Sequence, residues 1–252
     1  LLRAQKHPNT MSSPRSLQIC FVLLLLLPLR AAAVEGTLAA DKDNSLFENP
    51  DGAESNGSGA HLFVGKTNRG LLRRALVFFD VAASIPDGSM IESVSLTMNM
   101  SKTAAAEESV LLHRLVADWG EGDSDAGGQE GRGADAGNGD ATWIHTSSPD
   151  GRWETAGGDF DSSPSAELVV GSDGSYTWGS TPQMVADVRG WLDDPSTNFG
   201  WALIGNESSN KTAKRFDSRE HENEANRPVL TIVFDLTAVD DVSWGMVKLE
   251  AR

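Results

Sequence analysis

Polar and apolar residues alternate along much of the middle of the chain. Between residues 93 and 100, every second residue from Val94 to Met100 is apolar, and the residues between them are Ser, Thr or Asn. This period of two predicts a strand with one buried face. Other short apolar runs, bounded by Gly, Pro, Asn or Asp, predict strands at 75–79, 110–116, 201–204 and 229–234, with weaker candidates at 62–64, 168–170 and 176–178. The chain is therefore predicted to be rich in short strands.

One segment has the periodicity of a helix instead. Thr181 is a suitable N-cap, and Pro182 fits the first helical position. The apolar residues that follow fall on one helical face; they are Met184, Val185, Val188, Trp191 and Leu192. Eight or more strands with one such segment predict an all-β fold, a single β-sandwich of jelly-roll type with one short helix. No internal repeat is evident, so we expect one domain, over residues 38–236.

The N-terminal region is predicted to be a targeting segment. From Met11 the chain has a basic residue, an apolar run over 19–29 and three alanines ending at Ala33, which is typical of a secretory signal peptide over residues 11–33. The apolar run is shorter than the roughly 20 residues that span a bilayer as a helix, so we expect no transmembrane anchor. We interpret residues 1–10 as an artefact upstream of the natural start, and 237–252 as a C-terminal tail. The protein is expected to be secreted, and either extracellular or at the cell surface.

Charge and cysteine content exclude several classes of partner and site. The chain has 36 acidic residues against 21 Lys and Arg, for a formal charge of −15. Without residues 1–33, which hold four bases and no acid, the charge would be −19. Nucleic acids and anionic membrane surfaces need clustered positive charge, so this balance argues against both as partners. The one cysteine, Cys20, falls in the predicted signal peptide, so the processed chain is expected to lack disulfides and cysteine ligands.

The segment from 120 to 140 is unusually rich in glycine and acid, with eight Gly and six Asp or Glu in 21 residues. It is not an EF-hand, because a loop starting at Asp123 has Gly127 at the fifth ligand position and Ala134 at the twelfth. Two interpretations stay open, a calcium-ordered loop and a mobile acidic excursion. Oxygen-rich loops suit a hard cation, so Ca²⁺ is the expected ion if one binds. Its expected ligands are Asp41, Asp43, Asp123 and Asp125.

Several catalytic signatures fail on inspection. Ser58 lacks the glycine spacing of a nucleophile elbow, and His221-Glu222 lacks the second histidine of a helical zinc protease motif. Glu220, Glu222 and Glu224 offer carboxylates for glycoside cleavage, but acids clustered in one polar loop are usually just solvated. We therefore expect a protein that is not an enzyme.

Between residues 41 and 235 the chain resembles the DNRLRE domain family. The motif that gives the family its name has its counterpart in Asp43–Glu48, which reads DNSLFE. Further blocks follow in the family's order: 74–80 (RALVFFD), 85–88 (IPDG), 113–122 (HRLVADWGEG), 140–143 (DATW), 153–160, 187–191, 198–201 (NFGW), 214–220 (KRFDSRE) and 227–230 (RPVL). The resemblance rests on the order of these blocks across nearly the whole predicted domain.

The resemblance implies a secreted β-jelly roll similar to carbohydrate-binding modules found beside alginate lyases. It also implies an exported bacterial protein whose partner is a polysaccharide or a cell-envelope glycan, or other surface proteins. Fold and compartment follow from the resemblance more directly than the ligand does.

Aromatic and basic side chains are the candidate sugar-binding groups. Trp143 and Trp153 lie among Gly, Asp, His and Ser, so each is either an exposed platform for a sugar ring or a structural residue. Trp119, Trp191 and Trp201 are expected to be structural.

The second group of candidates is a charged run, Lys214, Arg215, Asp217, Arg219 and Glu220. On a strand, Arg215, Asp217 and Arg219 would share a face while Phe216 points to the core. That face would either grip a uronate, whose carboxylate matches the arginine fork, or form an internal salt-bridge lattice.

The leading hypothesis is thus a non-catalytic, exported carbohydrate-binding β-sandwich with a polysaccharide ligand, a uronate polymer in particular. The first alternative is a structural or adhesive protein of the cell surface or matrix, and the second is an unrecognised polysaccharide-degrading enzyme. A groove lined by the tryptophans and arginines would favour sugar binding, whereas burial of these residues in mutual contacts would favour a structural role.

Overall fold

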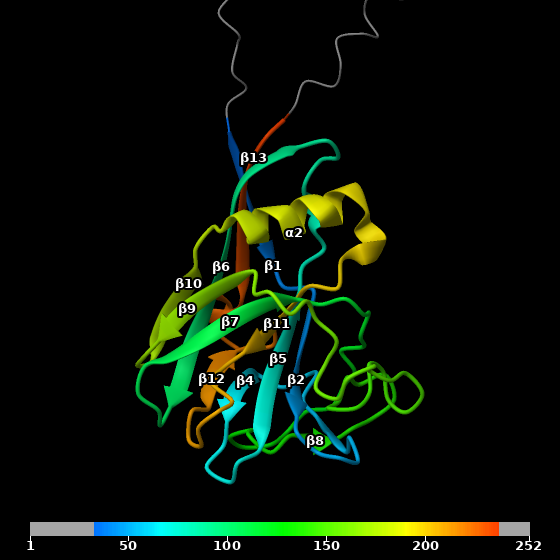
Figure 1. Ribbon diagram of the computed structural model, residues 1–252, viewed down its shortest axis with the longest axis vertical. Coiled ribbons are helices and arrows are strands. Elements are labelled where there is room, and N and C mark those ends of the chain that lie inside the picture. Colours follow the sequence, from blue (N-terminus) through cyan, green and yellow to red (C-terminus); the bar gives the residue numbers. More distant parts are fainter. Residues whose placement is uncertain (1–32, 237–252) are drawn as a thin grey trace, which may run out of the picture. The chain divides into compact units, whose positions relative to one another are not determined.

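The computed structural model describes residues 33–236, which form an all-β sandwich (Figure 1). The predicted tail, residues 1–10 and all of the predicted signal peptide except Ala33 lie outside the described residues. The strands are β1 (Val34–Ala39), β2 (Lys42–Phe47), β3 (Glu54–Ser55), β4 (His61–Lys66), β5 (Leu72–Phe78), β6 (Met90–Thr103), β7 (Glu108–Arg114), β8 (Ala134–Asp135), β9 (Ala166–Val170), β10 (Gly174–Trp178), β11 (Trp201–Ile204), β12 (Lys214–Asp217) and β13 (Val229–Asp235). The helical elements are α1 (Val81–Ser84), α2 (Pro182–Asp193), η1 (Pro195–Thr197) and η2 (Glu224–Asn226).

The strands form one curled antiparallel sheet that folds back on itself, in the order β1-β13-β6-β12-β4-β5-β11-β7-β9, with β10 also paired to β6 and β2 to β5. The sheet bends back at β4, whose first residues pair with β12 while Gly65 and Lys66 pair with β5. Gly65 has φ +94°, and a Cβ there would lie 2.9 Å from the carbonyl oxygen of Thr212. The corner therefore requires glycine for both conformation and space.

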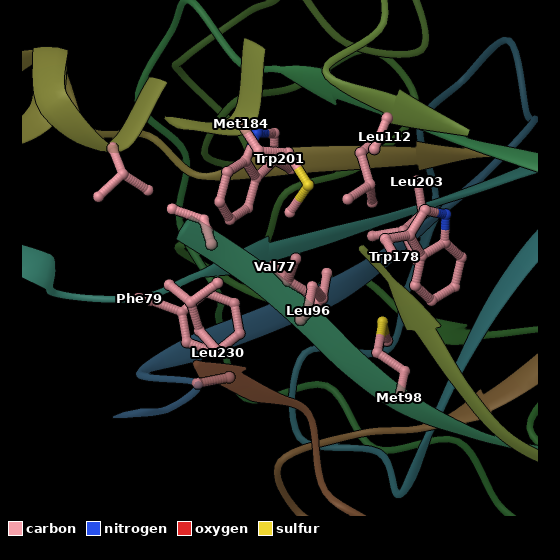
Figure 2. Close-up of a cluster of buried hydrophobic side chains, with 14 of the residues drawn as sticks. Val77, Phe79, Leu96, Met98, Leu112, Trp178, Met184, Trp201, Leu203 and Leu230 are labelled. Atoms are coloured by element: carbon pink, nitrogen blue, oxygen red, sulfur yellow. The ribbon is translucent and has the colours of Figure 1, made fainter. Parts of the chain in front are cut away.

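The main core lies between the two halves of this sheet (Figure 2). It receives the alternate residues of β6, including Leu96 and Met98, together with Val77 of β5 and Trp201 of β11. On the other face of β6, the Ser, Thr and Asn side chains stay partly exposed. The alternation seen in the sequence is thus the signature of a strand with solvent on one side.

A second apolar cluster covers the outer face of the β2-β5-β11-β7 half. Leu46, Leu76 and Ala202 point to this side, and the segment after β7 packs Trp119, Trp143 and Trp153 onto them. Because both faces of β5 are buried, its sequence is a continuous apolar run from Ala75 to Phe79 and does not alternate.

The predicted helix is confirmed as α2, which lies across one end of the sheets (Figure 1). The Thr181 hydroxyl accepts a hydrogen bond from the Met184 amide, and Pro182 is the first helical residue. Trp191 packs edge-on against Trp201 with ring centroids 4.5 Å apart, which fixes the helix on the core. Within residues 33–236, no helix has both the length and the apolar character to cross a membrane.

The predicted all-β sandwich is confirmed, and its curled antiparallel sheet is compatible with the jelly-roll type. Each predicted strand is present; β5 begins three residues before the predicted 75–79, β6 runs longer at both ends than 93–100, and the others lie within two residues of their expected bounds. The structure adds strands that lack a clear apolar pattern, namely β1, β2, β3 and β8.

Candidate functional site

The glycine-rich segment 120–140 packs closely against residues 55–61. The Ser58 amide donates to the Ser124 carbonyl, and the Ala126 amide donates to Asn56 Oδ1. A Cβ at Gly57 would lie 1.8 Å from the carbonyl oxygen of Glu121, so only glycine allows this approach. Ser124, Ala126, Glu130 and Asp140 are buried, and the segment is a packed layer rather than a free excursion. This layer brings Glu121, Glu130 and Arg132 to three different polar features.

The first feature is a cluster of carboxylates around Arg219. Asp43, Glu121 and Glu220 each place a carboxylate oxygen within 4.8 Å of the others. Arg219 Nη1 donates to Glu220 at 2.6 Å and to Glu121 at 3.2 Å, and the Arg219 amide donates to Asp43 Oδ2 at 2.8 Å. Arg219 and Glu220 were both predicted as sugar-binding residues. Arg219 lies beyond the end of β12, so it does not share a strand face with Arg215 as predicted, and the contacts of Arg219 and Glu220 are those of the alternative, a salt-bridge lattice.

Burial shapes the protonation of this cluster. It raises the pKa of Asp43 well above its ordinary value, and the neighbouring Glu220 raises it further. Burial likewise raises the pKa of Glu220 and of Glu121, although Arg219 opposes both shifts. Asp43 Oδ1 and Glu220 Oε2 are buried without a hydrogen-bond partner. The cluster therefore has the chemistry to share a proton or to accept a hard cation.

The four predicted calcium ligands do not converge. Asp43 lies in the carboxylate cluster, whereas Asp41 is exposed and accepts a hydrogen bond from the Asp80 amide. Asp123 and Asp125 are exposed in the glycine-rich layer. This corrects the predicted ligand set, because the acids that surround Asp43 are Glu121 and Glu220. Calcium binding itself stays a prediction.

The second feature joins two histidines to Asp217. Asp217, the last residue of β12, lies opposite His61 of β4 in the antiparallel register. Its carboxylate oxygens lie 3.7 Å from His61 Nε2 and 3.7 Å from His221 Nε2. Glu130 of the glycine-rich layer contacts the far side of the His61 ring, with 3.0 Å between Nδ1 and Oε1. Asp217 was predicted as a sugar-binding residue, and the structure surrounds it with nitrogen atoms of this chain.

Trp143 and Trp153 lie in the second apolar cluster and are only 8% and 6% exposed. The Arg74 guanidinium lies over the Trp143 ring, and Trp153 Nε1 donates to the Thr142 carbonyl. Neither ring presents a flat face to solvent, so the expectation of an exposed tryptophan platform is wrong. These rings cover the outer face of the sheet, and the alternative of a structural role describes them better.

Lys214 and Arg215 separate onto opposite faces of β12. Lys214 is buried on the same side as Phe216, and its ammonium group donates to the carbonyls of Ala106 and Gly171. Burial lowers the pKa of Lys214. Arg215 is half-buried, with hydrogen bonds to Ser101 and Gln129. Alternation along the strand thus places Arg215, but not the Lys214 ammonium, at the outer surface.

The third feature is a groove made by two adjoining cavities of about 470 and 300 Å³. The cavities share Thr67, Asn68, Arg73 and Gly131, so they form one continuous depression beside the β4–β5 turn. Five basic side chains line it, against two acidic ones, Glu48 and Glu54; the five are Arg69, Arg73, Lys102, Arg132 and Arg215, while the ammonium group of Lys214 is buried on the other face of β12. In an acidic protein, this groove is a local concentration of positive charge.

Arg73 lies where the two cavities meet and is the most buried of these five side chains. Its guanidinium stacks 4.7 Å from the Phe47 ring, and Nε has no hydrogen-bond partner. Burial lowers its pKa to about 10, partly offset by Glu54 and Glu48, so it stays charged at neutral pH. A buried arginine with an unused donor is suited to an anionic ligand.

No protein-family model matches the chain, and a search of curated proteins found no match. The resemblance to the DNRLRE family therefore stays a prediction. In the structure, the residues that carry it hold elements together: Asn44 donates to Ser55 and to the Glu121 carbonyl, and Glu48 accepts from the Leu72 amide.

Several of these site residues have no signal in the sequence. His61, Glu130 and Arg73 carry no local motif, and Glu121 was noted only as one of many acids. The pairing of β4 with β12 brings His61 to Asp217 across more than 150 residues of sequence, so no spacing pattern marks it.

Proposed function

We propose that this protein is an exported, non-catalytic module that binds an acidic polysaccharide, a uronate polymer in particular, in the basic groove. The observation that carries the proposal is the gathering of five Lys and Arg side chains along the groove of a chain whose net charge is strongly negative. Such a local patch attracts a polyanion that the rest of the surface repels.

The chemistry of the groove supports a carboxylated sugar. Arginine presents a planar fork that binds a carboxylate through two hydrogen bonds, and Arg69, Arg132 and Arg215 are at least partly exposed there. Phe63 and the aliphatic part of Thr67 add apolar surface to the wall. The groove replaces the tryptophan platform as the proposed sugar site, and Arg215 is the residue common to both hypotheses.

The test is affinity electrophoresis of the purified protein in gels containing alginate or polygalacturonate, with a neutral glucan gel for comparison. We expect retardation by the acidic polymers, lost in the double variant Arg69→Ala/Arg215→Ala and weakened by salt. The control is the double variant Arg152→Ala/Arg189→Ala, which removes the same two positive charges from exposed positions outside the groove lining. Equal loss in both variants would mean that binding follows overall charge and would overturn the groove proposal.

A structural or adhesive surface module is the second candidate function. It is favoured by the burial of Trp143, Trp153 and Asp217 and by the mutual contacts of Arg219 and Glu220. Folded protein that no acidic or neutral polymer retards would favour this second candidate.

A further inference from the structure

We infer that His61, Asp217 and His221 form a binding site for one divalent transition-metal ion, with Zn²⁺ as the first choice. This inference does not depend on the proposed polysaccharide binding, because none of the three residues lines the basic groove. One ligand atom from each residue lies within 4.8 Å of the others.

The backbone fixes the positions of all three residues. His61 and Asp217 are opposite one another on adjacent antiparallel strands. His221 lies four residues after Asp217, in a turn closed by the hydrogen bond from its amide to the Ser218 carbonyl. The two imidazole rings meet edge to face with centroids 5.7 Å apart, on either side of the Asp217 carboxylate.

Glu130 sets the tautomer of His61. Its carboxylate accepts from the Asn56 side chain and the His61 amide, and its other oxygen lies 3.0 Å from His61 Nδ1. A carboxylate at Nδ1 holds the ring proton there and leaves the Nε2 lone pair directed to Asp217. The same carboxylate–histidine arrangement orients metal ligands in known sites.

The Asp217 carboxylate has one oxygen that lacks a partner. Oδ2 accepts from the side chains of Asn99 and Asn226, at 2.7 and 3.1 Å. Oδ1 is fully buried with no hydrogen-bond partner, and it faces His61 Nε2 at 3.7 Å. With the proton of His61 on Nδ1, two acceptors face each other in a buried place, which is costly unless a cation lies between them.

The spacing and the donor types select the ion. Two ligands bonded to a tetrahedral ion at about 2.0–2.1 Å lie roughly 3.3–3.4 Å apart. The contact of His61 Nε2 with Asp217 Oδ1, at 3.7 Å, needs to close by a few tenths of an ångström. The ligand atoms of all three residues lie within 4.8 Å of one another, so the other distances need to close by at most about 1.5 Å. Imidazole nitrogens suit Zn²⁺, Cu²⁺ and Ni²⁺, whereas Ca²⁺ prefers oxygen ligands throughout. The histidine side chains are 14% and 16% exposed, so a water molecule can reach the fourth position.

His221 has a contact that competes with metal binding. The Asn223 amide lies 3.2 Å from His221 Nδ1, which favours a proton on Nε2 pointing to Asp217 Oδ2. The Asn223 carbonyl lies 3.3 Å from the same Nδ1 and accepts its proton when a metal takes Nε2. Metal binding therefore needs a change of tautomer at His221 alone.

The test is titration of the purified, metal-stripped protein with Zn²⁺ by calorimetry, and with Co²⁺ by visible absorption. We expect one saturable site per chain, tetrahedral Co²⁺ bands, a higher melting temperature with Zn²⁺, and no competition from millimolar Ca²⁺. Glu130→Gln should weaken Zn²⁺ binding about 10-fold by loosening His61. His221→Gln should weaken binding more, because it removes a ligand.

The control is Glu222→Gln, which removes a neighbouring exposed charge and no ligand, and should bind Zn²⁺ as the unchanged protein does. Circular dichroism without metal checks that each variant keeps its fold. Absence of a saturable site in the unchanged protein, or equal affinity in folded His221→Gln, would overturn the inference.

Discussion

The two halves of the curled sheet differ in what covers their outer faces. On β6, inward Leu96 and Met98 alternate with polar side chains that remain partly exposed. On β5, Ala75 and Val77 face the main core while Leu76 faces the second cluster, and all three are buried. Alternation therefore marks the half that has solvent on one side, and continuous apolar runs mark the half that is buried on both.

The cover over the second half has almost no regular secondary structure. It is built from the segment after β7, whose tryptophans supply apolar surface and whose polar groups are held by hydrogen bonds to backbone carbonyls. The glycine-rich layer, residues 120–140, is part of this segment. It supplies Glu121 to the carboxylate cluster, Glu130 to the histidine cluster and Arg132 to the groove. The part of the molecule with the weakest sequence pattern thus carries much of its candidate chemistry.

Truncation of one buried leucine in each half of the sheet tests whether the second apolar cluster is packed as tightly as the main core. Leu96 and Leu76 are both fully buried, so Leu96→Ala and Leu76→Ala should each destabilise the fold by about 2–5 kcal/mol. Urea unfolding followed by tryptophan fluorescence measures both.

Val169→Ala, on the exposed face of β9, is the matched control and should change stability by less than about 0.5 kcal/mol. If Leu76→Ala lowered the free energy of unfolding no more than Val169→Ala, the second apolar cluster would contribute no packing energy. The comparison between the halves would then fail.

A pair of glycine substitutions sharpens the comparison at the level of the backbone. Gly57→Ala forces a Cβ to within 1.8 Å of the Glu121 carbonyl oxygen, so the glycine-rich layer has to move. We expect a loss of about 1–3 kcal/mol in unfolding free energy and faster proteolysis of the layer.

Gly190→Ala, within α2, is the contrasting substitution. A Cβ there meets no atom within 4 Å, and alanine favours the helix, so it should stabilise the fold by about 0.5–1 kcal/mol. If Gly57→Ala were as well tolerated as Gly190→Ala, the close approach of the layer to residue 57 would not exist in solution.

The same contrast explains what the sequence could predict. The strands around Leu96 and the helix around Trp191 follow from local periodicity and capping, because each pattern reports a single buried face. The burial of Trp143 could not be predicted, since its neighbours are polar and the surface that covers it comes from β2, β5 and β11. His61 and His221 lie far apart in sequence, and only strand register and a turn bring them to Asp217.

The smallest expected effect concerns the carboxylate cluster and depends on pH. The pKa of Asp43 in the folded protein is raised, chiefly by burial, above the value of about 3.9 expected for an unfolded chain. Its contribution to stability is therefore fully present below about pH 4 and is lost as the pH rises through the folded pKa. Asn lacks this titration. In chelator, the free energy of unfolding of Asp43→Asn should therefore exceed that of the unchanged protein by on the order of 1 kcal/mol at pH 7.5, and should equal it at pH 4.

Melting curves of both proteins between pH 4 and pH 8, with chelator and with Ca²⁺, measure this difference. Because the two conditions differ only in the cation, a change in the sign of this difference between chelator and Ca²⁺ must come from cation binding. If Ca²⁺ binds Asp43, Glu121 and Glu220, it stabilises the unchanged protein, and Asp43→Asn then becomes the less stable of the two. A difference that is independent of pH in chelator would mean that Asp43 is not the buried, proton-binding group of the carboxylate cluster.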